Sequence, residues 1–285
     1  AGDVNGDGWL DLLVSAHFAT ANGNTKAGKT YVVFGKKVMT NITLSSTFGG
    51  IAQGFVINGA QASEESGTSV SSAGDFNGDG LADLLIGAYF STANGWTQAG
   101  NTYVVFGKTS GTAIDLAQVA LGNGGFVIKG DNAYDLSGVS VSSGGDINGD
   151  GLADIIVGAP NKAEGTELKT GYSYVVYGKS TSTNVNLTDV ADNKGGFAII
   201  GQGADDMSGY SVSAAGDVNG DGLADLIVGA YGYDAANSAL VETGRAYIIF
   251  GSKGGPFAAG TAVDNAGTSA NDTLISTGSQ TLAGG

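Results

Sequence analysis

The residues best suited to chemistry are oxygen-bearing side chains in a nine-residue pattern, Asp-x-Asn-Gly-Asp-Gly-x-x-Asp, which occurs four times. The copies run from Asp3 to Asp11, Asp75 to Asp83, Asp146 to Asp154 and Asp217 to Asp225. Oxygens at positions 1, 3 and 5 of a tight loop converge on one point, and a final carboxylate closes the far side. Glycine at position 6 permits the sharp reversal of the chain. This donor set is suited to a hard cation such as Ca²⁺.

The pattern assigns ligands by position. Side chains at positions 1, 3, 5 and 9 supply oxygens, and a main-chain carbonyl at position 7 adds another. The expected side-chain ligands are Asp3, Asn5, Asp7 and Asp11; Asp75, Asn77, Asp79 and Asp83; Asp146, Asn148, Asp150 and Asp154; and Asp217, Asn219, Asp221 and Asp225. The expected carbonyl ligands are those of Trp9, Leu81, Leu152 and Leu223. We therefore expect about four Ca²⁺ ions, one for each repeat.

This pattern has two other possible interpretations. An EF-hand loop has twelve residues, ends in a bidentate Glu and is flanked by helices, so it is excluded. Metal-free hairpin turns are the second interpretation, because Asn-Gly and Asp-Gly are common turn sequences. Hairpin turns account for the glycines. They do not account for three aspartates kept in register, because uncompensated carboxylates a few ångströms apart repel one another.

The composition is strongly acidic, with 27 Asp and Glu against 12 Lys and Arg and a net charge of -15. Four Ca²⁺ ions would add eight positive charges and bring the balance to about -7. Nucleic acid is not expected as a partner, because the sequence has no basic patch that would bind phosphates. No apolar run approaches the ~20 residues of a membrane span, so we expect no membrane insertion. The chain has no Cys, and packing and metal must stabilise it instead of disulfides.

The repeats also predict the fold. The loops recur after 72, 71 and 71 residues, and each unit contains four short apolar or small-residue stretches that are typical of strands. In the second repeat these are Ser66–Ser71, Leu84–Ala88, Tyr103–Gly107 and Phe126–Ile128. Helical periodicity is essentially absent. Four antiparallel strands at a fixed period indicate an all-β protein built as a β-propeller.

The recurring combination of Ser-Gly-x-Ser-Val, Gly-Asp-x-Asn-Gly-Asp-Gly, a Gly-Ala that ends the second strand and Tyr-Val-Val-Phe-Gly resembles the FG-GAP repeat of integrin α-subunit propellers and their bacterial relatives. The resemblance covers residues 1–257. It implies about four blades, at 1–58, 59–129, 130–200 and 201–257, within a larger ring of, for example, seven. Residues 258–285 form a tail or closing strands. The opening Phe-Gly of the family is Ser-Gly here, and Gly-Ala-Pro is complete only at Gly158–Pro160.

Both ends of the chain carry expectations of their own. The first copy begins at its metal loop and lacks the preceding strand, and the natural N-terminus is expected to lie upstream. We expect Thr273–Ser276 to be the fourth strand of the last blade and Gln280–Ala283 to replace the missing first strand. The stretch Gly267–Ile275 is similar to a degenerate nonapeptide of the repeats-in-toxin type. Such tails imply a secreted bacterial protein.

Antiparallel connectivity divides the loops between two faces. The metal loops join strands 1 and 2, so the 2–3 and 4–1 loops lie on the opposite face. Those loops vary and include Trp96, which we expect to contact a protein or glycan ligand. They also carry acidic residues, and the simplest interpretation of Glu64, Asp135 and Asp206 is a solvated acidic rim.

Catalysis is not expected, because the parts of a nucleophilic site are missing. The chain has a single His, His17, and no Cys, and carboxylates saturated by Ca²⁺ cannot donate protons. Two functions outside catalysis fit the residues. One is an extracellular calcium-binding propeller for adhesion or recognition. The other is a structural subunit of a surface layer or filament, in which neighbouring copies complete each other's blades by strand addition.

Overall fold

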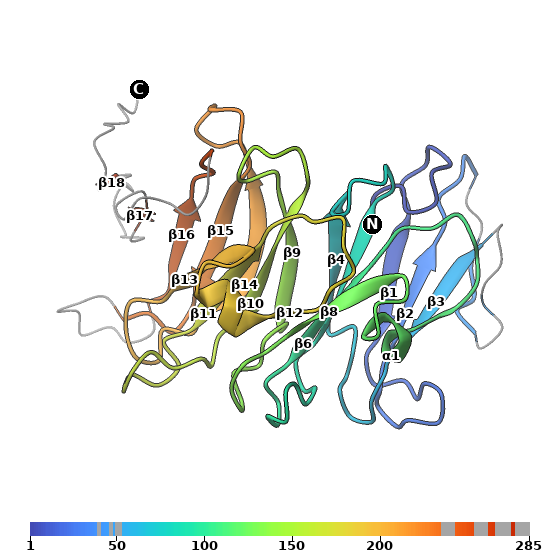
Figure 1. Cartoon of the computed structure of the whole chain (residues 1–285), viewed down its shortest axis with the longest axis horizontal. Coiled ribbons are helices and arrows are strands. Elements are labelled where there is room, and N and C mark those ends of the chain that lie inside the picture. Colours follow the sequence, from blue (N-terminus) through green and yellow to red (C-terminus); the bar gives the residue numbers. More distant parts are fainter. Residues whose placement is uncertain are drawn as a thin grey trace.

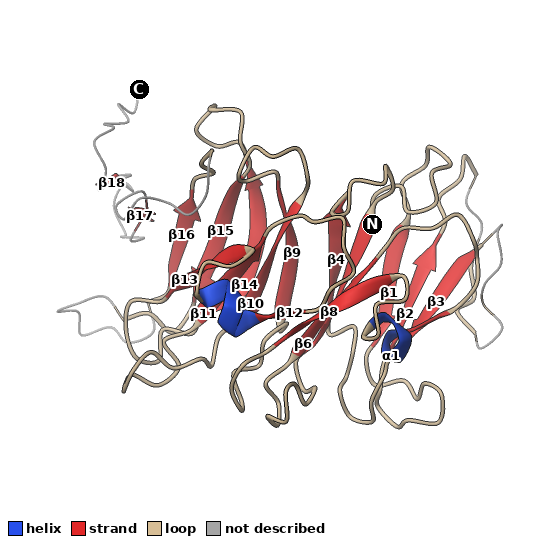
Figure 2. Cartoon of the chain, viewed as in Figure 1, coloured by secondary structure: helices blue, strands red, loops and turns tan. Residues whose placement is uncertain are grey.

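The computed structural model describes residues 1–38, 41–45, 48, 53–234 and 243–253, together with the backbone of 262–265 and 275–276. In these residues the chain forms sheets that lie side by side in chain order (Figure 1). Strands and loops make up nearly all of the described chain, and two short helices are added between strands (Figure 2). The predicted all-β fold of four antiparallel blades is confirmed.

Each sheet is one blade, and its main strands pair in antiparallel fashion in the order of the sequence. In blade 1 they are β1 (Leu12–Ala16), β2 (Lys29–Val33) and β3 (Gly54–Asn58). In blade 2 they are β4 (Ser69–Gly74), β5 (Asp83–Ala88), β6 (Asn101–Val105) and β8 (Gly125–Lys129). In blade 3 they are β9 (Ser140–Gly145), β10 (Asp154–Ala159), β11 (Tyr172–Val176) and β13 (Gly196–Ile200). In blade 4 they are β14 (Ser208–Gly216), β15 (Asp225–Ala230), β16 (Arg245–Ile249) and β17 (Ala262–Asn265).

The first strands of neighbouring blades lie against one another. Strand β9 contacts both β4 and β14, and the Ser69 hydroxyl accepts a hydrogen bond from the Val141 N–H at 3.1 Å. Ser140 makes the same bond to Val212 of the next blade. Small side chains in these strands permit the close approach, which explains the Ser- and Gly-rich sequence of every first strand. The blades are therefore packed as a radial array with their first strands innermost.

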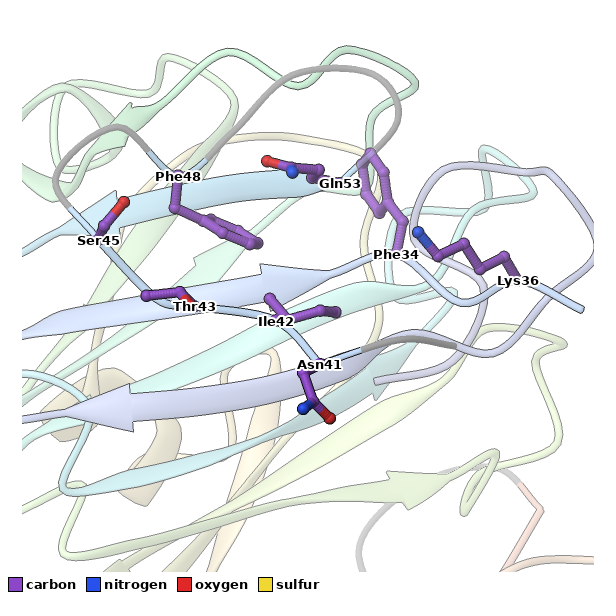
Figure 3. A pocket seen from close by; sticks show the side chains of 8 residues that line it. All are labelled: Phe34, Lys36, Asn41, Ile42, Thr43, Ser45, Phe48 and Gln53. Carbon is purple, nitrogen blue, oxygen red and sulfur yellow. The ribbon is translucent and has the colours of Figure 1, made fainter. Parts of the chain in front are cut away.

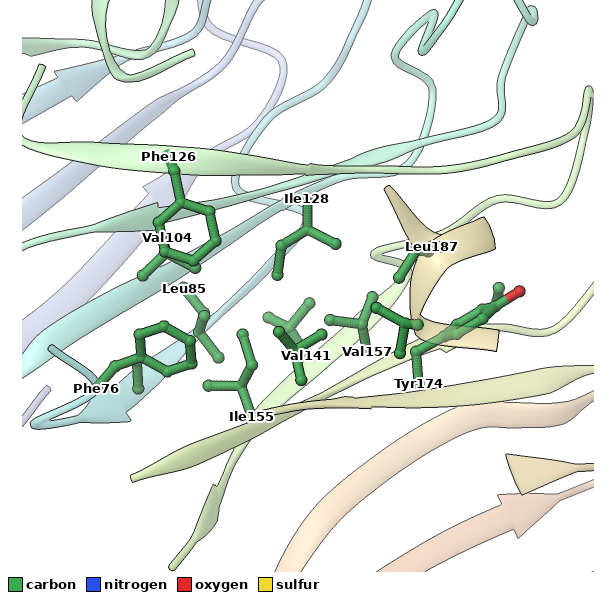
Figure 4. Close-up of a cluster of buried hydrophobic side chains, with 14 of the residues drawn as sticks. Phe76, Leu85, Val104, Phe126, Ile128, Val141, Ile155, Val157, Tyr174 and Leu187 are labelled. Carbon is green, nitrogen blue, oxygen red and sulfur yellow. The ribbon is translucent and has the colours of Figure 1, made fainter. Parts of the chain in front are cut away.

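The core lies between the blades. Strand β5 is buried along its whole length because β4 and β6 pair with its edges and blades 1 and 3 cover its faces. Figure 4 shows Leu85, Val104 and Phe126 of blade 2 facing Ile155 and Val157 of blade 3. Continuous apolar runs in the second strands thus reflect burial on both faces, as predicted.

A short parallel strand followed by a helix, here called a clasp, joins each of the first two blades to the next one. Strand β7 (Ile114–Asp115) leaves blade 2 and pairs in parallel with the outer edge of β3, and the helix α1 (Leu116–Val119) follows it. Strand β12 (Val185–Asn186) and helix α2 (Leu187–Ala191) of blade 3 do the same at β8. Neither the helices nor the extra parallel strands were predicted, because the sequence shows essentially no helical periodicity and only four strand-like stretches in each repeat.

The clasp should contribute measurably to stability. Leu187 in α2 is fully buried, and Leu187→Ala should lower the free energy of unfolding by about 2–5 kcal/mol because it leaves a cavity. Leu121 follows α1 and is 73% exposed, so Leu121→Ala should change the free energy by less than about 0.5 kcal/mol. Urea unfolding of both variants measures the difference. Equal effects would show that the clasp does not bury Leu187 in solution.

The last blade corrects one expectation. Its fourth strand is β17, which pairs with β16 from Ala246↔Asn265 to Ile249↔Ala262, and the predicted Thr273–Ser276 does not occupy that position. Strand β18 (Ile275–Ser276) instead adds outside β17. The segment nearest in sequence takes the position because short connections favour pairing of consecutive strands. Gln280–Ala283 and most of the nonapeptide-like stretch lie outside the described residues.

The expected acidic rim is also wrong for three residues. Glu64, Asp135 and Asp206 are 1%, 5% and 5% exposed. Each has partners: the Glu64 carboxylate accepts from the Tyr103 hydroxyl at 3.2 Å, and Asp135 forms an ion pair of 3.3 Å with Lys162. The Asp206 carboxylate accepts from a main-chain N–H. These acids stabilise the loops between blades and do not form a free surface, because the following blade covers them.

Candidate metal centres

The four Asp-rich loops occupy equivalent places in the blades. Residues 75–82, 146–153 and 217–224 connect the first and second strands of blades 2, 3 and 4, as predicted, and the loop at 3–11 leads into β1. Because second strands run in the same direction in every blade, the loops lie at one end of the array. Glycines at positions 4 and 6 have positive φ, for example +77° at Gly78 and +89° at Gly80, which explains why other residues are excluded there.

Position 1 is the centre of the hydrogen bonding in the first, third and fourth loops. One Asp3 carboxylate oxygen accepts from the N–H groups of Gly6 at 2.8 Å and Asp7 at 3.1 Å, and the other accepts from Gly8 at 2.8 Å. Asp146 and Asp217 make the same three bonds in their loops. The loop backbone therefore wraps around this carboxylate with its N–H groups pointing inward.

Positions 3 and 5 are held together at the exposed side of the loop. In the second loop the Asn77 side-chain oxygen accepts from Asp79 N–H at 2.8 Å, and the Asn77 amide donates to the Asp79 carboxylate at 2.9 Å. The other Asp79 oxygen accepts from Leu81 N–H at 2.9 Å. The same bonds recur in the other three loops. Two oxygen-bearing side chains thus lie next to the position-7 backbone in every copy.

Position 9 is buried, and its carboxylate joins the loop to the third strand. Asp83 is fully buried, and its two oxygens accept from Gly107 N–H at 2.8 Å and Phe76 N–H at 3.0 Å. The equivalent aspartates bond the glycine that follows the third strand of their own blades, namely Gly35, Gly178 and Gly251. This second role was not predicted from the sequence. The available signal was the glycine that ends the Tyr-Val-Val-Phe-Gly stretch and its equivalents, which stands 24 residues after position 9 in the first three repeats and 26 residues after it in the fourth.

Burial changes the acidity of these carboxyl groups. It raises the pKa of Asp83 to about 7 and that of Asp154 to about 6, although main-chain N–H donors partly oppose the increase. Burial also raises the pKa of Asp11. In each case the neighbouring carboxylates of the loop add to the increase. Negative charge at position 9 is therefore only partly compensated by the N–H groups, and a cation beside it would compensate the rest.

The donor set fits a hard cation. Every expected ligand is an oxygen, and carboxylates predominate, which suits Ca²⁺ or Mg²⁺. One Asp75 carboxylate oxygen is buried and accepts no hydrogen bond, so it has lone pairs available. In the described residues no group of three or more His, Cys, Asp and Glu side chains could hold a metal by themselves. Asn77 and the position-7 carbonyl would therefore have to complete the coordination shell. Asp83 could also contribute, because its carboxylate retains lone pairs beyond those that accept N–H bonds.

Other features of the described chain do not form a second centre. His17 stacks against Phe18 with ring centroids 4.1 Å apart. A pocket of about 340 Å³ in blade 1 is lined by Phe34, Ile42 and Phe48 among others (Figure 3). No helix in the described part of the chain has the length and hydrophobicity needed to cross a bilayer.

Comparison with known proteins agrees with this architecture. Integrin alpha pat-2 of Caenorhabditis elegans is 30% identical over 246 residues, which is 85% of this chain and 18% of that protein. Integrin alpha-V of Gallus gallus is 28% identical over 82% of this chain and 20% of its own length. Phosphatidylinositol-glycan-specific phospholipase D of Bos taurus is 29% identical over 67% of this chain and 22% of its own length. The chain thus spans about a fifth of the length of these relatives.

The family comparison falls on the same parts of every blade. The FG-GAP repeat model matches residues 1–33, 66–105, 137–176 and 208–249, which include each Asp-rich loop and the strands around it. These segments cover more than half of the chain and end with the third strand of their blades. The chain therefore belongs to the FG-GAP repeat family and is an integrin-like β-propeller protein.

Proposed function

We propose that this chain is an extracellular calcium-binding propeller module for adhesion or recognition. The observation that carries the proposal is the fourfold recurrence of a loop that brings oxygen-bearing side chains together at positions 1, 3 and 5 and buries a carboxylate at position 9. Ligands at positions 1, 3, 5, 7 and 9 of each loop would hold one Ca²⁺. The ion's role is structural, because the carboxylates at position 9 tie each loop to the third strand of its blade.

The calcium affinity expected for such sites supports the extracellular assignment. Extracellular modules bind Ca²⁺ with dissociation constants of roughly 10⁻⁴–10⁻³ M, and such weak sites are filled only where calcium is millimolar. The chain has no Cys, so metal must do the work that disulfides do in many secreted domains. The similarity to integrin alpha chains supports a place at the cell surface.

The end of the blades opposite the Asp-rich loops is the proposed ligand surface. There Trp96 is 50% exposed and Tyr134 is 59% exposed, and the Tyr134 N–H donates to the main-chain oxygen of Thr97 at 3.0 Å. Aromatic side chains of this kind provide large contact areas for a protein or for the apolar face of a sugar. The rigid blades below would fix the position of these loops.

Trp96 is the residue to test first. Trp96→Ala should weaken binding to a protein or glycan ligand by at least ~10-fold, because an aromatic anchor typically contributes more than ~1.4 kcal/mol. Binding to cells and to a glycan array measures the change, with Leu121→Ala as the matched control on an exposed residue elsewhere. If Trp96→Ala binds as the wild type does, the assignment of this surface is wrong.

The proposed function is not enzymatic. One relative is a phospholipase D by name, but the match covers 22% of it and identifies no catalytic residue in this chain. In the described residues His17 contacts an aromatic ring, and no hydrogen bond joins it to a nucleophile. An assay for hydrolysis of phosphodiester and glycosidic substrates would test this absence directly.

A second function would use β1 as an edge for strand addition. Within the described residues β1 pairs with β2 alone, whereas its equivalents β5, β10 and β15 pair on both sides. Leu12 and Val14 of β1 are 56% and 41% exposed. A neighbouring copy that added a strand here would build a surface layer or filament. Electron microscopy with and without calcium separates the functions, because ordered polymers favour this second one and a ligand-binding monomer favours the first.

A further inference from the structure

The Asp-rich loops of neighbouring blades bond directly to one another. The Ala82 N–H donates to the main-chain oxygen of Asp3 at 3.0 Å. Ala153 makes the same bond to Asp75 at 3.2 Å, and Ala224 to Asp146 at 3.1 Å. The donor is position 8 of one loop, between the ligand positions 7 and 9, and the acceptor belongs to position 1 of the preceding loop. The bond therefore connects the ligand-bearing backbones of two sites.

A packing contact joins the same pairs of loops. The Leu81 side chain, at position 7, lies so close to Gly6 that a Cβ on Gly6 would be 2.9 Å from it. Leu152 packs on Gly78 in the same way, and Leu223 packs on Gly149. Gly6 stands between ligand positions 3 and 5 of its loop. Each leucine thus fills the space beside the ligands of the preceding loop, and a side chain at that glycine would have to displace it.

A third contact runs through the base of the loops. The main-chain oxygen of Val4 accepts from Lys108 N–H at 2.9 Å, and the adjacent Gly107 N–H donates to the Asp83 carboxylate at 2.8 Å. Val4 stands between positions 1 and 3 and is fully buried between blades. The pairs Lys179 with Phe76 and Ser252 with Ile147 repeat this contact. Movement at position 9 of one loop is therefore transmitted to positions 1–3 of its neighbour.

We propose that the four loops bind calcium with positive cooperativity, through these three contacts between successive blades. This inference rests on the proposed calcium sites. A cation in one loop orders positions 1–5, which hold the backbone at positions 7–9 of the next loop. The next cation then meets a partly ordered site and loses less conformational entropy on binding. The coupling is reciprocal, so each site raises the affinity of both of its neighbours.

The leucine contact can be removed without removing a ligand. The combined variant Leu81→Ala, Leu152→Ala and Leu223→Ala keeps every carboxylate, amide and main-chain carbonyl of the sites. Leu10→Ala is the matched control, because Leu10 stands at position 8 of the first loop, is 76% exposed and supplies no ligand, and the other three loops already carry Ala at this position. Circular dichroism establishes that both variants are folded.

Hydrogen exchange measured by mass spectrometry at graded free Ca²⁺ follows each loop separately. In the wild type the four loops should gain protection over the same calcium range, with a Hill coefficient of about 2 or more. The triple variant should show separate midpoints and a Hill coefficient near one, and Leu10→Ala should behave as the wild type. In a second experiment Asp79→Ala should raise the calcium midpoints of loops 1 and 3 by about 5-fold or more, and that of loop 4 by less.

The outcomes distinguish this inference from the proposed function. If no loop gains protection and calorimetry detects no calcium binding, the proposed metal sites themselves are wrong. If calcium binds with a Hill coefficient of one in the wild type, or if Asp79→Ala leaves loops 1 and 3 unchanged, the sites exist and cooperativity is refuted. An equal loss of cooperativity in Leu10→Ala and the triple variant would also refute coupling through the leucines.

Discussion

Removing calcium with EGTA should lower the melting temperature by on the order of 20 °C, the largest effect expected for this chain. In about 10 mM calcium, which is about 100 times a dissociation constant of roughly 10⁻⁴ M, each site stabilises the folded state by about 2.7 kcal/mol. Four sites together contribute about 11 kcal/mol, and each kcal/mol corresponds to about 2 °C for a chain of this size. Differential scanning calorimetry with and without EGTA measures the shift.

The identity of the ion is the control for this experiment. Adding back calcium should restore the melting temperature fully, whereas an equal concentration of magnesium should restore less, because magnesium demands octahedral geometry and gives up its water reluctantly. A melting temperature that does not respond to EGTA would mean that hydrogen bonds alone hold the loops. The Asp-rich loops would then be structural turns.

Asp154→Ala should strongly destabilise the protein, and it should do so even without calcium. Asp154 is fully buried and accepts from the N–H groups of Gly178 at 2.8 Å and Ile147 at 3.0 Å. Each buried N–H that loses its acceptor costs about 1–3 kcal/mol, so the variant should lose about 2–6 kcal/mol in EGTA. In calcium it should lose the ion's contribution as well. Urea unfolding in EGTA measures the loss from the broken hydrogen bonds, and urea unfolding in calcium adds the loss of the ion.

Asp150→Ala is the matched variant, because Asp150 is exposed at position 5 of the same loop. Its carboxylate accepts from Leu152 N–H, and this bond can be replaced by water. We expect Asp150→Ala to destabilise the protein by about 2–3 kcal/mol in calcium, through the lost site, and by less than about 1 kcal/mol in EGTA. Equal losses for both variants in EGTA would contradict the structural role assigned to position 9.

Asp150 and Asp154 differ in how far the local sequence could predict their roles. The ligand candidates follow from spacing within nine residues, because a tight loop brings alternate side chains together whatever surrounds it. The N–H donors that hold Asp154 could not be predicted in this way. Gly178 is distant in sequence and reaches the carboxylate only because the third strand pairs with the second.

The loops at the end of the blades opposite the Asp-rich loops also include one residue whose exposure was predicted from the sequence and one whose exposure was not. Trp96 was expected on an exposed loop, and it is half-exposed. Glu64 was expected in a solvated rim and is buried, because Ser91 and Tyr103 of the next blade bond its carboxylate. A charged residue in a variable loop gives no local sign of such partners. Burial of an acid depends on which hydroxyl groups another blade brings to it.

The sequence by itself determined the strands, the repeat and the Asp-rich loops, since each depends on residue types within a few positions of one another and recurs at a fixed period. Only the tertiary structure decided the clasps at β7 and β12, the replacement of the expected last strand by β17, and the contacts that join one loop to the next. These features arise where successive blades meet. Their geometry is set by the packing of whole sheets, which no local pattern specifies.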